Sequence, residues 1–232
     1  MKPWVSPLCA LVTGIATLAI LVGFSQLAEV KAAYPNGDFS AALSAFQRAT
    51  SVDQLIALFG NPPDSGKLAA MTAGNSLDLY GFIPVYTIFL LWGAIMVGRG
   101  RALVWFPIVA VLIGCAGDIY ETSSQLAIST DWSKAGALQP HVAMGCWIKF
   151  FGLAVHALGV SALCFTGERK RWILGVLGLT PIIGTTLDYF ELVHIPALMT
   201  VTFALFWVAL IVVAAIEVFH TTRKPAAISA AA

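Results

Sequence analysis

Residues 103–128 read LVWFPIVAVLIGCAGDIYETSSQLAI, an apolar stretch long enough to cross a bilayer as a helix. The only charged residues in it are Asp118 and Glu121, both in its second half. A carboxylate at the centre of such a helix costs roughly 2.5 to 3.5 kcal/mol on insertion scales, so it usually faces a bundle interior or a watery cavity. The stretch therefore predicts a membrane-spanning helix with one polar face.

The same signature, I-G-x-x-x-D-x-[YF]-E, occurs at residues 113–121 and again at 183–191. The second copy supplies Asp188 and Glu191, at a similar distance into its own apolar stretch. Two matching pairs of costly carboxylates indicate a site rather than chance. The signature does not by itself name a reaction.

The composition places the whole chain in the membrane. Of its 232 residues, 59% are hydrophobic and 11% are charged, whereas soluble domains contain about 25% charged residues. Six stretches are long and apolar enough to span a bilayer, so we expect an all-α, polytopic six-helix bundle that forms a single membrane domain over residues 1–232. The predicted spans are residues 4–28, 79–97, 103–128, 142–165, 172–194 and 196–218. A net charge of +1 from scattered basic residues excludes a nucleic-acid partner.

The basic residues predict the orientation of the spans. They fall in alternate connections, as the positive-inside rule requires when both chain ends are cytoplasmic. These residues are Lys2, Arg99, Arg101, Arg169, Lys170, Arg171, Arg223 and Lys224. We therefore expect a multi-pass protein of the bacterial plasma (inner) membrane, with residues 31–75 on the outer side.

Residues 31–75 are too polar to form a span. Phe39, Leu43 and Phe46, followed by Leu55 and Phe59, alternate with polar residues in the pattern of one or two short amphipathic helices. The segment either caps the outer mouth of the bundle or lies beside it as an interfacial anchor, and the sequence leaves both interpretations open.

The fourth span supplies a countercharge for the carboxylates. Lys149, the only lysine within a predicted span, shares a stripe with Gly145, Gly152 and His156, and small residues at such spacing let helices approach closely. A buried cation beside carboxylates is the cheapest way to accommodate both. We therefore expect an outer-leaflet cavity, or alternatively a structural salt-bridge network. Its predicted members are Asp118, Glu121, Lys149, Asp188 and Glu191, with Asp78 and His194 as further candidates.

Since both signature helices run in the same direction, the pattern also allows a parallel internal repeat, in which spans three and four correspond to spans five and six. The D-x-x-E pairs, together with Asp78-x-x-x-x-Ile83-Pro84-x-Tyr86, resemble uncharacterised bacterial multi-spanning membrane proteins. This resemblance implies a membrane location and no activity.

Three classes of function fit these residues. We favour a structural or assembly role, in which the charges fasten helices to one another or to a membrane subunit partner. The first alternative is binding or transport of a small molecule, lipid or proton, in which a homo-oligomer could complete the path.

The second alternative is an intramembrane enzyme that acts on a lipid-like substrate by acid-base chemistry or with a transition metal. The ligand types suit zinc, manganese or iron. The candidate metal ligands are Asp118, Glu121, Asp188, Glu191 and His194.

Overall fold

The computed structural model describes residues 2, 4–167, 171–192 and 197–222. In this part of the chain it contains six helices that are long and apolar enough to cross a membrane, and it contains no strand. The predicted all-α six-helix class is therefore confirmed. The six candidate spans are Val5–Phe24 (α1), Ser65–Gly98, Ala102–Thr130, Trp132–Thr166, Trp172–Tyr189 (α9) and Leu198–Thr221, most of α10 (Leu198–Thr222).

The second span is longer than predicted. It consists of α5 (Ser65–Leu77), a π-helical turn η1 (Asp78–Phe82) and α6 (Ile83–Gly98). Helix α5 begins early because the Asp64 carboxylate accepts hydrogen bonds from the backbone N–H groups of Gly66 (2.8 Å) and Lys67 (3.1 Å). Residues 65–75 therefore belong to the second span, and the predicted non-spanning segment, residues 31–75, extends too far toward the C-terminus.

The third and fourth spans are extended by short 3-10 turns. The third is η2 (Ala102–Val104) followed by α7 (Trp105–Thr130), and the fourth is η3 (Trp132–Lys134) followed by α8 (Ala135–Thr166). The fourth span was predicted to begin at residue 142, with Pro140 at the end of the preceding loop. Pro140 instead lies within the first two turns of α8.

Helix α9 is shorter than predicted, because it ends at Tyr189 in a Schellman motif. The backbone N–H of Leu192 donates to the carbonyl of Leu187 (3.0 Å), and that of Glu191 donates to the carbonyl of Asp188 (3.2 Å). Glu191 has a φ of 53° in the left-handed region, where glycine is usual. Glu191 therefore lies beyond the end of the helix, and the predicted fifth span, residues 172–194, is too long at this end.

Between the first two spans lie three short helices, α2 (Ala28–Ala33), α3 (Phe39–Arg48) and α4 (Val52–Phe59). The last two are the predicted amphipathic helices. Helix α4 begins where the Ser51 hydroxyl accepts a hydrogen bond from the backbone N–H of Gln54 (3.3 Å).

The described chain divides into two compact units. The first unit comprises Met1–Ile15, Tyr86–Val111 and Ala154–Ala232, and the second comprises Ala16–Val85 and Leu112–Leu153. In the first unit, α9 packs closely on α10, since a Cβ added to Gly184 would lie 2.7 Å from the hydroxyl of Thr202. The expectation of a single membrane domain stays a prediction.

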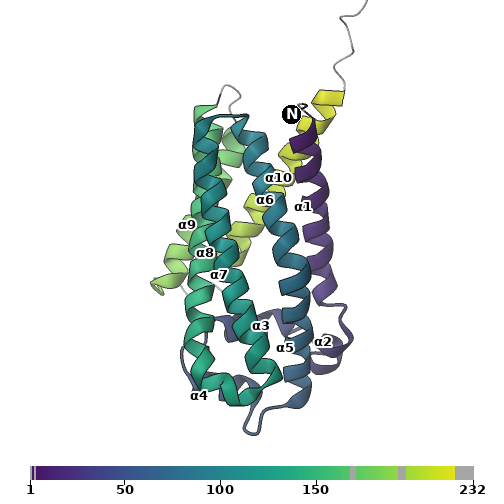
Figure 1. Ribbon diagram of the computed structural model, residues 1–232, viewed down its shortest axis with the longest axis vertical. Helices are drawn as coiled ribbons and strands as arrows, with labels where there is room; N and C mark the ends of the chain where they lie inside the picture. The colour runs from purple at the N-terminus through teal and green to yellow at the C-terminus, as the bar shows by residue number, and fades with distance from the viewer. Residues whose placement is uncertain (1, 3, 168–170, 193–196, 223–232) are drawn as a thin grey trace, which may run out of the picture. The chain divides into compact units, whose positions relative to one another are not determined.

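The second unit has its own hydrophobic core, here called the short-helix core, at the end where α7 turns into α8 (Figure 1). Aromatic rings fill it, and Phe46 and Phe59 meet edge to face with ring centres 5.1 Å apart. The Gln139 side chain of α8 donates to the backbone carbonyl of Ala49, just after α3, over 2.6 Å. The short helices are therefore packed onto α7 and α8. The buried residues of the core are Val30, Phe39, Ala42, Phe46, Ala49, Leu55, Phe59, Ala70, Met71, Ile128, Ala135 and Val142.

Candidate functional site

The second unit holds a buried lysine between two carboxylates. The Lys149 ammonium lies 2.6 Å from Oε2 of Glu121 and 3.1 Å from Oδ1 of Asp118. The three side chains are 7%, 0% and 4% exposed, respectively. The three charges are therefore buried inside the unit. Breaking a buried ion pair is costly, because the remaining charge stays uncompensated.

Glycines bring the two helices close enough for this ion pair. A Cβ added to Gly117 of α7 would lie 2.6 Å from the backbone nitrogen of Lys149. A Cβ added to Gly145 of α8 would lie 2.7 Å from the backbone nitrogen of Glu121. Because real Cβ atoms do not approach so closely, both positions require glycine at this helix spacing.

A third carboxylate reaches the same place from the π-helical turn. Thr122 donates its hydroxyl to Oδ2 of Asp78 (3.2 Å) and also lies 3.5 Å from Oδ1 of Asp118. Asp78 is buried, and π-helical turns within α-helices frequently occur at functional sites. We call Asp78, Asp118, Glu121 and Lys149 the carboxylate cluster.

Two glutamines complete the surroundings of Glu121. Gln125, one turn further along α7, donates to Oε1 of Glu121 over 3.3 Å. The side chain of Gln47, on α3, also hydrogen-bonds the Glu121 carboxylate. The segment between the first two spans therefore contacts the cluster directly, which supports the cap interpretation over a separate interfacial anchor.

Polar side chains continue from the cluster along the contact of α5 with α7. At one end Thr72 donates to the hydroxyl of Ser129 (2.9 Å), and at the other end Thr122 donates to Asp78. This antiparallel progression places Asn75 at the level of Gln125. We call these six residues the polar seam.

The middle of the seam is buried and incompletely hydrogen-bonded. Both amide atoms of Asn75 and the amide oxygen of Gln125 have no hydrogen-bond partner among the described residues. Each orphaned buried polar atom costs about 1 to 3 kcal/mol. Such atoms are rare in folded proteins and commonly mark a place where water or a ligand binds.

The far end of the seam opens into a groove. Its volume is about 580 Å³, and Thr72 and Ser129 contribute to its wall. The remaining lining residues are Glu29, Ser65, Leu68, Ala69 and Ala73. Polar groups therefore run from an open groove to the buried carboxylates.

The other predicted site residues lie elsewhere. Asp188 and Glu191 belong to the first unit, where Asp188 is half-buried and Glu191 is exposed. His194 lies outside the described residues. Among the residues that are described, no group of three His, Cys, Asp or Glu side chains is arranged to hold a metal ion.

His156 follows Lys149 on its predicted stripe and belongs to the first unit. It is fully buried, and its Nδ1 donates to the backbone carbonyl of Pro107 over 2.9 Å. This bond fastens α8 to the start of α7. The burial and the hydrogen bond of His156 therefore give it a role in helix packing.

The sequence interpretation missed Thr122 and Gln47. It placed Gln125 on the same helical stripe as Glu121, and the structure shows a hydrogen bond between the two. Thr122 stands four residues after Asp118, a spacing that could have indicated it. Nothing in the sequence links Gln47 to a helix that follows so much later in the chain.

No family model, curated protein or solved structure matches this chain. Its function therefore has to be argued from the residues themselves.

Proposed function

We propose that this multi-pass membrane protein takes up and releases protons at the carboxylate cluster, and that it acts in proton-dependent binding or transport. The observation that carries the proposal is the imbalance of three buried carboxylates against one ammonium group. A one-to-one salt bridge would leave no excess charge, whereas among the four residues of this cluster two carboxylates are in excess.

The excess charge has a physical consequence. An uncompensated carboxylate away from water is so costly that the group takes up a proton instead. Lys149 neutralises one unit of charge at Asp118 and Glu121. Within the described residues, the hydrogen-bond donor to Asp78 is the Thr122 hydroxyl. The arrangement supports a proton held at Asp78, next to the Thr122 hydroxyl.

The polar seam supports a route for that proton. Proton relays in membrane proteins use chains of polar side chains and water between buried acids and solvent. Asn75 and Gln125 offer both donors and acceptors midway between the groove and Asp78. A water chain along the seam would also satisfy their orphaned atoms.

Infrared spectroscopy of the purified protein tests proton binding. We expect a carbonyl band of a protonated carboxyl group that disappears as the pH is raised and that is absent from the Asp78→Asn variant. Asp188→Asn, which removes one carboxylate from the first unit, is the control and should keep the band.

A second variant guards against loss of folding. Thr122→Val keeps every charge and nearly the same shape, and should shift the pH at which the band disappears. A wild-type protein without such a band at any pH at which it stays folded would overturn the proposal.

A structural role remains the second candidate, favoured by the close approach of α7 and α8 at Gly117 and Gly145. It predicts a cluster that stabilises the helix pair and shows no titration. The two candidates therefore differ in the infrared result and not in the effect on stability.

The orientation is part of the proposal. Basic residues in alternate connections support cytoplasmic chain ends in a bacterial inner membrane. The groove and α2–α4 would then face the outer side, and the seam would bring protons from there.

A further inference from the structure

We propose that three arginines of the first unit, Arg99, Arg101 and Arg171, bind the phosphate group of an anionic phospholipid. We call them the arginine cluster. This inference is independent of the proton-binding proposal, because it uses other residues in the other unit.

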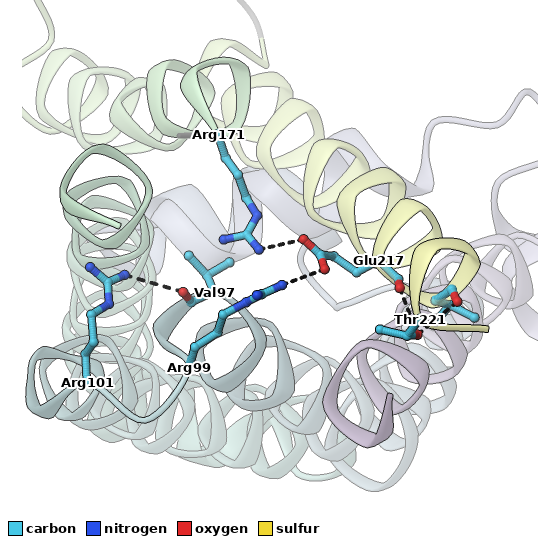
Figure 2. A network of polar contacts seen from close by, with 7 residues as sticks. Val97, Arg99, Arg101, Arg171, Glu217 and Thr221 are labelled. Atoms are coloured by element: carbon cyan, nitrogen blue, oxygen red, sulfur yellow. Dashed lines mark hydrogen bonds and ion pairs between the residues drawn. The ribbon is translucent and has the colours of Figure 1, made fainter. Parts of the chain in front are cut away.

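Two of the arginines share one buried carboxylate, as Figure 2 shows. Arg99 lies 2.6 Å from Oε2 of Glu217, and Arg171 lies 2.7 Å from Oε1 of the same residue. Glu217 is buried, while the Arg99 side chain is 49% exposed. Glu217 therefore fixes both guanidinium groups and leaves one of them open to the surroundings.

Backbone oxygens hold the third arginine. Arg101 donates to the carbonyls of Leu163 (2.7 Å) and Gly98 (3.1 Å) and to the hydroxyl of Thr166 (3.0 Å). In the described part of the chain, Glu217 is the one carboxylate that pairs with the arginine cluster. Counted over the described residues, three guanidinium groups against one carboxylate leave two positive charges in excess.

The turn between α6 and α7 is built to present these side chains. Arg99 has a φ of 47°, in the left-handed region that side chains other than glycine rarely adopt, and Gly100 follows with a φ of 80°. In Figure 2 Arg99 points toward Glu217, while Arg101 lies on the other side of Val97. This left-handed pair ends α6, as left-handed residues commonly do at helix C-termini.

Two exposed tryptophans indicate the depth of the arginine cluster. Trp105, the first residue of α7, is 65% exposed, and Trp172, which directly follows Arg171, is 61% exposed. Exposed indoles at the ends of membrane helices lie at the level of the lipid headgroups. The arginine cluster should therefore lie where phospholipid phosphates are found.

The chemistry favours a phosphate group. The planar guanidinium group forms paired hydrogen bonds with phosphate oxygens, and the excess positive charge matches an anionic lipid better than a zwitterionic one. Basic pockets between membrane helices bind such headgroups in other proteins. Glu217 then acts as a partial countercharge that keeps the arginines in place when no lipid is bound.

Native mass spectrometry of the full chain in a neutral detergent tests this proposal. We expect phosphatidylglycerol to be retained more strongly than phosphatidylcholine. Arg99→Gln and Arg101→Gln should each weaken that retention about fivefold. Arg48→Gln, which removes an exposed arginine of the second unit, is the matched control and should leave it unchanged.

Glu217→Gln gives a prediction of opposite sign. Removal of the countercharge should strengthen phosphatidylglycerol binding if the site recognises lipid, whereas a purely structural clamp would only become less stable. Size-exclusion chromatography verifies that each variant is folded.

Equal retention of the two lipids, or unchanged retention in Arg99→Gln and Arg101→Gln, would overturn the proposal. Saturable binding of inorganic phosphate without any preference between the lipids would also overturn it, and would assign the arginine cluster to free phosphate.

Discussion

Lys149 is the residue on which the carboxylate cluster depends, because it is the ammonium group within reach of both Asp118 and Glu121. Removing one partner of a buried ion pair costs more than removing the whole network, since the remaining charges stay buried without compensation. The two kinds of substitution should therefore have different effects.

Lys149→Met should lower the free energy of unfolding by about 3 to 5 kcal/mol, as measured by denaturant or thermal unfolding in detergent. Adding Asp118→Asn and Glu121→Gln should recover most of this loss. Lys134→Met is the control, because Lys134 is 52% exposed and its pair with Asp131 is a surface one. A Lys149→Met protein as stable as the wild type would contradict the assigned ion pair.

At the level of single residues, the sequence predicted part of the carboxylate cluster. The helical spacing of Asp118 and Glu121, and the glycine-lined stripe of Lys149, were sufficient to bring these three residues together. Gln47 was unpredictable, because it comes from a separate short helix whose docking depends on tertiary packing. Glu217 was missed since it was read as the end of an apolar span.

Among the elements, α7 and α8 form the closest described contact at the cluster, through Gly117 and Gly145. The bounds of α7 followed from hydropathy to within a few residues, whereas α8 begins at Ala135, well before its predicted start at residue 142. Local geometry also overrode hydropathy in two other spans. The Asp64 cap lengthened the second span, and the Schellman motif at Glu191 shortened α9. Hydropathy carries no information on either feature.

Gly145→Ala should destabilise the protein by about 1 to 3 kcal/mol, because the added methyl group would overpack the contact with Glu121. Gly136→Ala is the matched control on the same helix, since its Cβ would lie 3.9 Å from Val52, an ordinary contact. Unfolding in detergent compares the two. Equal effects would show that the glycine at 145 is not required by helix packing.

The short-helix core makes a separate prediction. Phe46→Ala should remove about 3 to 5 kcal/mol of packing energy, because the ring is fully buried against Phe59. The six spans should stay inserted, so the change should appear as faster hydrogen exchange in α3 and α4. Ala45→Gln, at an exposed position of α3, should leave exchange unchanged.

For the whole molecule, composition and hydropathy predicted the membrane class and the six spans, but not the division into two units. The two copies of I-G-x-x-x-D-x-[YF]-E suggested equivalent sites. The structure places them in different units, and in the described part of the chain Asp118 and Glu121 pair with Lys149. Identical short motifs acquired different surroundings because one helix continues past its glutamate and the other ends before it.

The orientation can be measured with single cysteines in a chain whose four native cysteines are replaced by alanine. Asp53→Cys, on α4, should react with a membrane-impermeant maleimide in intact cells, because positive-inside topology places it outside. Ala102→Cys, at an exposed position, should react only after the membrane is opened. The reverse pattern would show that the chain is inserted the other way round.

The short-helix core also bears on how the chain is made. Phe46, Leu55 and Phe59 emerge from the ribosome well before Ile128 and Val142, the α7 and α8 residues that cover them. Domains fold as units, and incompletely packed intermediates expose apolar surface that favours aggregation. We therefore expect the amphipathic helices to stay incompletely packed at the membrane surface until the α7–α8 hairpin has been inserted. Chains interrupted before that hairpin would expose these aromatic side chains to proteases and chaperones.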